Sequence, residues 1–245
     1  MPAKPVYLAS DVHLGAVPPE REEAFLGWLR HTPRVASRVV LNGDLFDFWF
    51  EYRRGVPRGY DAVLNTLREV VDAGVPVTLM GGNHDWWGGR YLREEIGVEF
   101  LQDPVVREYA GLRTFLAHGD GLGKGDLGYR FLKSMLRGRP TRFAFGFLGP
   151  DLGGWVAGRV SKTHVRWGAP TADDKARAAA LEAWAEARLR ADPSLDLVVL
   201  GHTHIPVLRE VAQGRWYLNA GDWVFHATYA VLEEGAGPRL LTWEG

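Results

Sequence analysis

Short apolar runs recur along the chain, and each ends abruptly in glycine, aspartate, asparagine or histidine. Runs of aliphatic and β-branched residues that are closed by turn residues are typical of buried strands. Seven strands are therefore predicted, at Val6–Ser10, Val39–Leu41, Val75–Met80, Thr114–Ala117, Leu195–Leu200, Trp216–Leu218 and Tyr229–Leu232.

Apolar residues at helical spacing separate several of these runs. They predict helices over Glu20–His31, Tyr60–Asp72 and Thr171–Arg190. Thr171 is a good N-cap, and Asp173 and Asp174 favour the start of a helix because they complement its dipole. Strands that alternate with helices indicate an α/β architecture.

Composition narrows the class of protein. The 245 residues are 46% hydrophobic, which is enough to form one large globular domain, with or without an insertion. The absence of cysteine excludes a disulfide scaffold, a thiol nucleophile and a cysteine zinc site. A net charge of −1 gives the whole molecule no general attraction to nucleic acid, so no nucleic-acid partner is expected. The N-terminus does not read as a signal peptide and no stretch reaches 18 apolar residues, so we expect a cytoplasmic protein.

One segment, residues 122–168, differs from the rest of the chain, and we call it the basic segment. It carries nine basic and two acidic side chains together with many large apolar ones. This combination predicts basic amphipathic helices, broken at Gly138–Pro140 and at Gly149-Pro150. Such helices suit a membrane surface or an anionic ligand, although a helical hairpin with solvated arginines explains the composition equally well.

Five polar motifs follow the predicted strands. They are Asp11-Val12-His13, Gly43-Asp44-Leu45-Phe46-Asp47, Gly82-Asn83-His84-Asp85, His118-Gly119-Asp120 and Gly201-His202-Thr203-His204. In α/β folds the carboxyl ends of the strands form the ligand-binding edge of the sheet. The three remaining histidines, His31, His164 and His226, are interpreted as surface or packing residues.

The motifs have the composition of a metal site. On an extended chain residues two apart point the same way, so Asp11 and His13 could reach one cation, as could His202 and His204. Imidazole with carboxylate suits Mn²⁺, Fe²⁺ or Zn²⁺. The seven candidate ligands are Asp11, His13, Asp44, Asn83, His118, His202 and His204. Seven donors are too many for one tetrahedral ion but suffice for two if one carboxylate bridges, and two-metal sites activate water and hold phosphoryl oxygens.

The order of these motifs over residues 11–204 resembles the signature of the calcineurin-like metallophosphoesterases. The resemblance implies a four-layer α/β/β/α sandwich with a dinuclear metal site. It implies that Asp44 bridges two ions, one held by Asp11, His13 and His204 and the other by Asn83, His118 and His202. It further implies that His84 acts near the leaving group and is oriented by Asp85, while Asp47 orients a ligand.

Within that family the chain is most similar to the UDP-2,3-diacylglucosamine pyrophosphatases. The similarity lies in Asp44-Leu45-Phe46-Asp47-Phe48-Trp49 and in the stretch from His118 to Tyr129. In those enzymes a helical lid is inserted after this stretch, where the basic segment lies. The resemblance implies a single domain over residues 1–245 with this lid inside it. The substrate contacts that it implies are Trp49, Lys124, Asp126, Tyr129, Arg159, Ser161 and Lys162.

Together these features predict a metal-dependent pyrophosphatase. The resemblance implies hydrolysis of UDP-2,3-diacylglucosamine to 2,3-diacylglucosamine 1-phosphate (lipid X) and UMP in lipid A biosynthesis, with two Mn²⁺ ions, at the inner-membrane surface. Well-characterised members carry Arg at the position of His84, where the wider family carries His. Two alternatives stay open: a phosphoesterase for a soluble nucleotide or another phosphate ester, and a binding scaffold without activity. The sequence does not indicate an oligomeric state.

Overall fold

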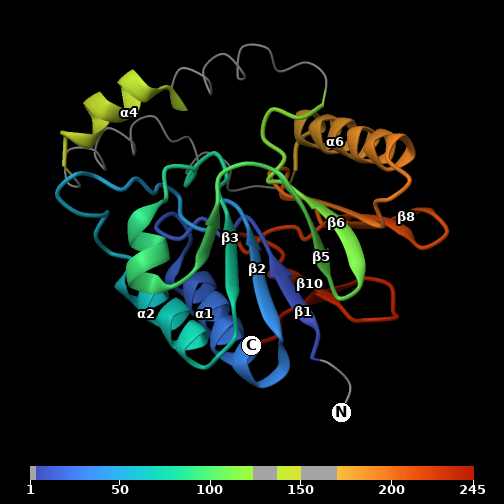
Figure 1. Ribbon diagram of the computed structural model, residues 1–245, viewed down its shortest axis with the longest axis horizontal. Coiled ribbons are helices and arrows are strands. Elements are labelled where there is room, and N and C mark those ends of the chain that lie inside the picture. Colours follow the sequence, from blue (N-terminus) through green and yellow to red (C-terminus); the bar gives the residue numbers. More distant parts are fainter. Residues whose placement is uncertain (1–3, 124–136, 150–169) are drawn as a thin grey trace.

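Figure 1 shows the computed structural model of the chain, which describes residues 4–123, 137–149 and 170–245. The helices are α1 (Pro19–Val35), α2 (Asp61–Asp72), the short π-helix η1 (Leu92–Ile96), α4 (Arg139–Gly146) and α6 (Ala172–Ala191). The strands are β1 (Val6–Ala9), β2 (Arg38–Asn42), β3 (Val77–Met80), β4 (Glu99–Leu101), β5 (Val105–Tyr109), β6 (Leu112–Leu116), β7 (Leu197–Leu200), β8 (Val207–Ala212), β9 (Arg215–Asn219), β10 (Thr228–Leu232) and β11 (Arg239–Thr242).

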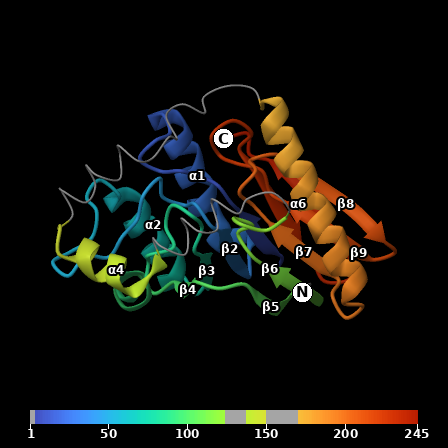
Figure 2. The same ribbon diagram turned by 90° about the horizontal axis from the view of Figure 1, so that it is seen from above.

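The strands form two sheets that face each other. The first has the order β11-β10-β1-β2-β3-β4 and the second has the order β5-β6-β7-β9-β8. Helices α1 and α2 cover the outer face of the first sheet, and α6 covers the outer face of the second (Figure 2). The predicted α/β/β/α sandwich is therefore confirmed.

Alternation of side chains along the strands produces three apolar layers. Leu8, Val40 and Val199 fill the space between the sheets. Their chain neighbours point outward, so Ala9 and Val39 pack with helices α1 and α2, and further residues of β7 pack against α6. Strands that are buried on both faces explain why the sequence shows continuous apolar runs rather than alternation.

All seven predicted strands and all three predicted helices are present. Thr171 caps α6 as predicted, in a capping box with Asp174. Helix α1 runs beyond the predicted end at His31 and includes Pro33, which has no amide hydrogen to donate to the carbonyl of Leu29. The hydroxyl of Thr32 donates to that carbonyl instead, at 2.7 Å, and so satisfies it.

Strands β4, β5, β8 and β11 were not predicted, and all four lie at or near sheet edges. Edge strands are partly exposed, and their sequences lack the continuous apolar run that marks a central strand. For example, β5 alternates partly buried and exposed residues along most of its length.

The basic segment is described only in part, because residues 124–136 and 150–169 lie outside the described ranges. Within it, α4 begins directly after Gly138 with Pro140 in its first turn, as the break predicted at Gly138–Pro140 requires. That this segment is a lid inserted into one domain stays a prediction. Within the described ranges, no helix combines the length and the apolar character that a membrane crossing requires.

Candidate metal centre

The five polar motifs meet at one edge of the two sheets. Each follows the carboxyl end of a strand: Asp11 and His13 follow β1, Asp44 follows β2, Asn83 follows β3, His118 follows β6, and His202 and His204 follow β7. Contacts between the sheets join them, since Nε2 of His13 lies 3.3 Å from Nε2 of His204, a residue 191 positions away. All seven candidate ligands are thus brought together.

Two separate groups of donors can be distinguished, joined by a third. Asp11, His13 and His204 form one, and Asp44, His118 and His202 form the other, with the donor atoms of each within 4.8 Å of one another. His13, Asp44 and His84 form the third cluster, which overlaps both groups. The carboxylate of Asp44 has Oδ2 at 3.2 Å from Nε2 of His118 and 3.8 Å from Nε2 of His13. Asp44 therefore lies between the two groups, where a bridging ligand is required.

Hydrogen bonds on the far side of two rings determine which nitrogen faces the centre. Nδ1 of His118 donates to the carbonyl of Asn42 at 2.9 Å, and Nδ1 of His204 donates to the carboxylate of Asp222 at 3.1 Å. In the neutral ring Nε2 then carries a lone pair. Nε2 of His118 faces Oδ2 of Asp44 and, at 3.3 Å, Oδ1 of Asn83.

Lone pairs that converge in this way repel one another unless a cation or a proton lies between them. Nitrogen and carboxylate oxygen together are the donors that Mn²⁺, Fe²⁺ and Zn²⁺ accept. The residues present therefore fit two divalent ions, and each histidine with a defined Nδ1 partner has the support that metal-ligating histidines normally have.

The pKa shifts of the buried ligands also indicate that the centre needs positive charge. Burial would raise the pKa of Asp44, but the imidazoles of His118, His84 and His13 hold it well below its usual range. Burial would lower the pKa of His118, yet Asp44 and Asp11 raise it to about 10. In the metal-free protein a proton on His118 thus compensates the carboxylate.

Burial dominates the pKa shifts of three other candidate ligands. It raises the pKa of Asp11, lowers that of His13 and lowers that of His202 to about 3. Burial would also lower the pKa of His204, but the carboxylates of Asp11 and Asp222 raise it.

The backbone at the centre differs from the expected extended form. Asp11 and His13 both have a φ of 53°, and His202 and His204 have φ of 69° and 60°. The left-handed region is costly for residues other than glycine and is found where the surrounding structure imposes it, often at functional sites. The prediction that an extended chain points both side chains the same way is therefore wrong. Sharp left-handed turns direct these side chains to the centre.

Glycines let neighbouring ligands approach the backbone. A Cβ on Gly82 would collide with Oδ1 of Asp44, and a Cβ on Gly201 would lie 2.7 Å from Oδ2 of Asp11. Side chains at these positions would displace two candidate ligands, which explains why glycine precedes Asn83 and His202 in the motifs.

Asp85 does not orient His84, contrary to prediction. Its buried carboxylate accepts hydrogen bonds from the backbone amides of Gly82 and Leu45, both at 2.7 Å, and so joins the loops after β2 and β3. The ring of His84 is held by Asp47 instead, because Nδ1 donates to the Asp47 carbonyl at 2.6 Å. The carboxylate of Asp47 lies 3.6 Å from Nδ1 of His13, and that it orients this candidate ligand stays a prediction.

Trp49 lies in the core, although a substrate contact was predicted. It has no exposed surface, and its indole stacks on Phe46 with ring centroids 4.4 Å apart and tilts against Tyr60. A large apolar ring is more stable in this packing than at the surface. The other predicted contacts, Lys124, Asp126, Tyr129, Arg159, Ser161 and Lys162, lie outside the described residues.

Asp222 and His226 lie next to the metal centre, although neither was predicted from the sequence to be a site residue. Asp222 is fully buried and binds His204. His226, interpreted from the sequence as a surface or packing residue, places Nδ1 3.2 Å from the other oxygen of Asp222. Gly221-Asp222 follows β9 after one intervening residue, Ala220, and Gly43-Asp44 follows β2 directly; this repeated Gly-Asp pair after a strand was the available signal.

Comparisons with known proteins agree with the geometry of a metal site. The family model for calcineurin-like phosphoesterases matches residues 4–206. The UDP-2,3-diacylglucosamine hydrolase of Porphyromonas gingivalis is 29% identical over 249 residues, with 93% of this chain and 94% of that protein aligned. The one of Bordetella pertussis is 32% identical over 230 residues, covering 89% and 85%. A solved structure of a hypothetical protein from Pyrococcus horikoshii OT3 shares the fold at a TM-score of 0.51 and 10% identity, covering 98% of this chain and 88% of that one.

Proposed function

This chain belongs to the calcineurin-like phosphoesterase family, and we propose that it hydrolyses UDP-2,3-diacylglucosamine with two Mn²⁺ ions. The observation that carries the proposal is the pair of donor groups with the carboxylate of Asp44 between them. Relatives named for this hydrolysis align with the chain over nearly their whole length, which supports the choice of substrate.

The reaction breaks one bond of the diphosphate. Water adds to one phosphorus, the bond from that phosphorus to the bridging oxygen breaks, and 2,3-diacylglucosamine 1-phosphate and UMP leave. Bound ions supply a water of lowered pKa and neutralise phosphoryl oxygens. Asp11, His13, Asp44 and His204 would hold one ion, and Asp44, Asn83, His118 and His202 would hold the other.

His84 is suited to transfer a proton to the departing oxygen. Nδ1 is occupied by the carbonyl of Asp47, which leaves Nε2 as the nitrogen that can exchange a proton with substrate. Its ring lies edge-on to His13 with centroids 4.8 Å apart, so it borders the metal centre. Asn83 would add a hydrogen bond to the phosphoryl group.

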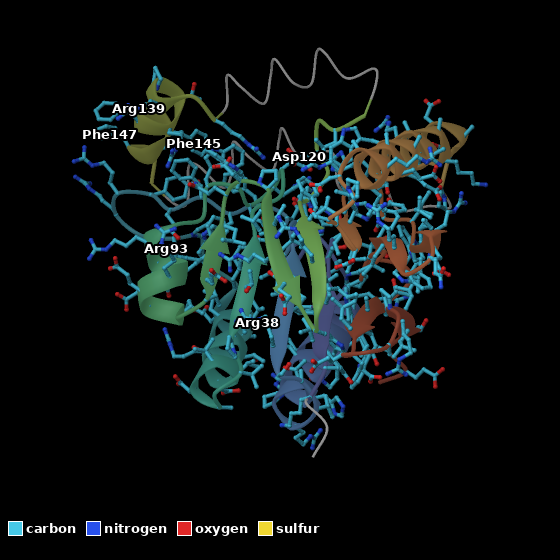
Figure 3. All side chains as sticks on the ribbon, turned by 45° about the vertical axis from the view of Figure 1, so that its right-hand side comes forward. Arg38, Arg93, Asp120, Arg139, Phe145 and Phe147 are labelled. Atoms are coloured by element: carbon cyan, nitrogen blue, oxygen red, sulfur yellow. The ribbon has the colours of Figure 1, made fainter. Side chains whose placement is uncertain are left out.

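Helix α4 supplies an apolar surface near this centre. Phe145 points inward and contacts Phe50 at 5.0 Å between ring centroids, whereas Phe147 lies toward the outside (Figure 3). Phe143 and Phe147 are 67% and 58% exposed, far more than large apolar side chains usually are. Directly before the helix, Arg137 donates to the carbonyl of Gly82 at 3.2 Å, next to Asn83. We propose that this exposed face binds the acyl chains.

An acyl-chain series tests the substrate. Each buried CH₂ contributes about 0.8 kcal/mol, so removing two carbons from each of the two chains lowers kcat/KM roughly 200-fold if the chains are fully bound. In Phe147→Ala the dependence on chain length should be flatter, while hydrolysis of a small chromogenic phosphodiester is retained. Steady-state kinetics on the series measures both.

A matched control is Val106→Ala, because Val106 is also exposed but lies on strand β5. Its chain-length dependence should equal that of the wild type. Equal turnover of acylated and deacylated UDP-glucosamine would exclude a lipid substrate and leave a phosphoesterase for soluble substrates.

We also propose that α4 contacts the inner-leaflet membrane surface from the cytoplasm. Arg139 and Arg142 are exposed beside the exposed Phe143, a combination that suits anionic headgroups above an apolar interior. Binding to anionic vesicles should weaken as salt rises and in Arg139→Glu, but not in Arg190→Glu on α6. Sedimentation that is independent of salt and of Arg139 would contradict this.

A further inference from the structure

We propose that Asp222 is a positioning residue of the metal centre: it holds His204 in the tautomer that presents Nε2 to an ion. The inference rests on the proposed dinuclear site and goes beyond it, because Asp222 is itself no ligand. It lies in the loop between β9 and β10, behind His204 as seen from the centre.

The two oxygens of Asp222 have separate partners. Oδ1 accepts the backbone amides of Phe225 and His226, at 2.9 and 3.0 Å, and faces Nδ1 of His226 at 3.2 Å. Oδ2 accepts Nδ1 of His204 at 3.1 Å. The donors on Oδ1 hold the carboxylate in one orientation, and in this orientation Oδ2 accepts the hydrogen bond from His204.

This hydrogen bond determines where the other nitrogen of His204 points. Nε2 lies 3.3 Å from Nε2 of His13 and 3.6 Å from Oδ1 of Asp11, and the rings of His13 and His204 stack with centroids 5.0 Å apart. A ring turned away, or one protonated at Nε2, removes one donor from the group of Asp11, His13 and His204. Asp222 therefore acts through His204 on one of the two ions.

The amide variant separates positioning from simple support of the loop. In Asp222→Asn the amide oxygen should stay with the backbone amides of Phe225 and His226, since they require an acceptor. The amide nitrogen then faces Nδ1 of His204 and, being a donor, favours the tautomer with hydrogen on Nε2. An amide in place of a histidine-orienting carboxylate imposes the wrong tautomer in hydrolase sites in this way.

Titration of the metal-free full-length protein with Mn²⁺ alone tests the inference. The wild type should bind two ions, and Asp222→Asn should lose about 10–100-fold in affinity for one of them while the other binds unchanged. Asp222→Ala should show a similar loss. Glu51→Gln is the control: Glu51 accepts the backbone amides of Gly89 and Tyr91, so it should lower the thermal midpoint but leave both Mn²⁺ affinities unchanged.

A spectroscopic readout keeps the result independent of stability. In the diamagnetic Zn²⁺-loaded wild type, ¹⁵N NMR should show His204 protonated at Nδ1, and this signal should be lost in Asp222→Asn. If Asp222→Asn binds both Mn²⁺ ions like the wild type, or keeps the Nδ1 proton, the inference is wrong although the metal centre stands. If the wild type itself binds no pair of ions, the proposed function fails and the inference with it.

Discussion

Asp44→Ala is expected to abolish hydrolysis and to leave at least one of the two ions unbound. The carboxylate of Asp44 lies between the two donor groups, within 4 Å of a ring nitrogen of His13 in one and of His118 in the other. The activity loss should exceed about 10⁴-fold, because at neutral pH the attacking water depends on ions that lower its pKa from 15.7 to about 7. Turnover and metal content per chain measure the two effects.

The control for this substitution is Asp103→Ala, which removes an exposed carboxylate between β4 and β5. It should retain both ions and full activity. Wild-type protein stripped of metal and kept in chelator should be as inactive as Asp44→Ala, and full activity in chelator would contradict the metal mechanism.

A second readout of Asp44 needs no metal. In the metal-free protein the charge of Asp44 is the main reason that the pKa of His118 is raised to about 10. Because the folded-state pKa is raised, the pair stabilises the metal-free fold fully below the unfolded value of 6.5, and this contribution is lost as pH rises through about 10. Asp44→Ala should therefore lower the pKa of His118, which histidine NMR detects, and should remove this loss of stability at alkaline pH.

The central strands could be predicted because each lies buried on both faces. Residues of β2 and β7 contact apolar layers on either side, so nearly every position must be apolar and the run is visible in the sequence. Strands β5 and β8 lie at the edges of their sheet and contain polar residues, so their signal is weak. Burial on two faces, rather than strand propensity, determined which strands could be predicted from the sequence.

The candidate ligands could be predicted because their order along the chain follows the order of strand ends. Parallel pairing of β1 with β2 and of β6 with β7 places those ends at one edge, so the topology brings the ligands together. The left-handed backbone of Asp11 and Asp44 could not be predicted, because residues other than glycine rarely adopt it and no sequence pattern marks the exceptions.

Residues that act behind the ligands left less signal. Asp85 adjoins His84 in the chain, which suggested a pair, but backbone donors on two loops bind its carboxylate. Asp222 lies 18 residues beyond His204, and only the folded loops bring the two into contact. Roles of this kind depend on side-chain direction, which sequence spacing does not determine.

His84→Ala is expected to lower kcat by about 10²–10⁴, the usual contribution of general acid–base catalysis. Metal content should change little, because Nδ1 of His84 donates to the carbonyl of Asp47 and the candidate ligands of both ions stay in place. His31→Ala is the control. His31 lies on helix α1 and packs against Trp243, so this substitution should leave kcat unchanged.

His84→Arg distinguishes a proton donor from a fixed positive charge. Arginine can bind a phosphoryl oxygen through its positive charge, so His84→Arg should still bind substrate. Arginine does not release a proton near neutral pH, so it cannot replace His84 as a proton donor. If the imidazole transfers the proton, His84→Arg should keep KM near the wild-type value and should have a low kcat. If His84→Ala hydrolyses UDP-2,3-diacylglucosamine with the wild-type kcat, His84 has no part in the chemical step, and the departing oxygen must take its proton from water.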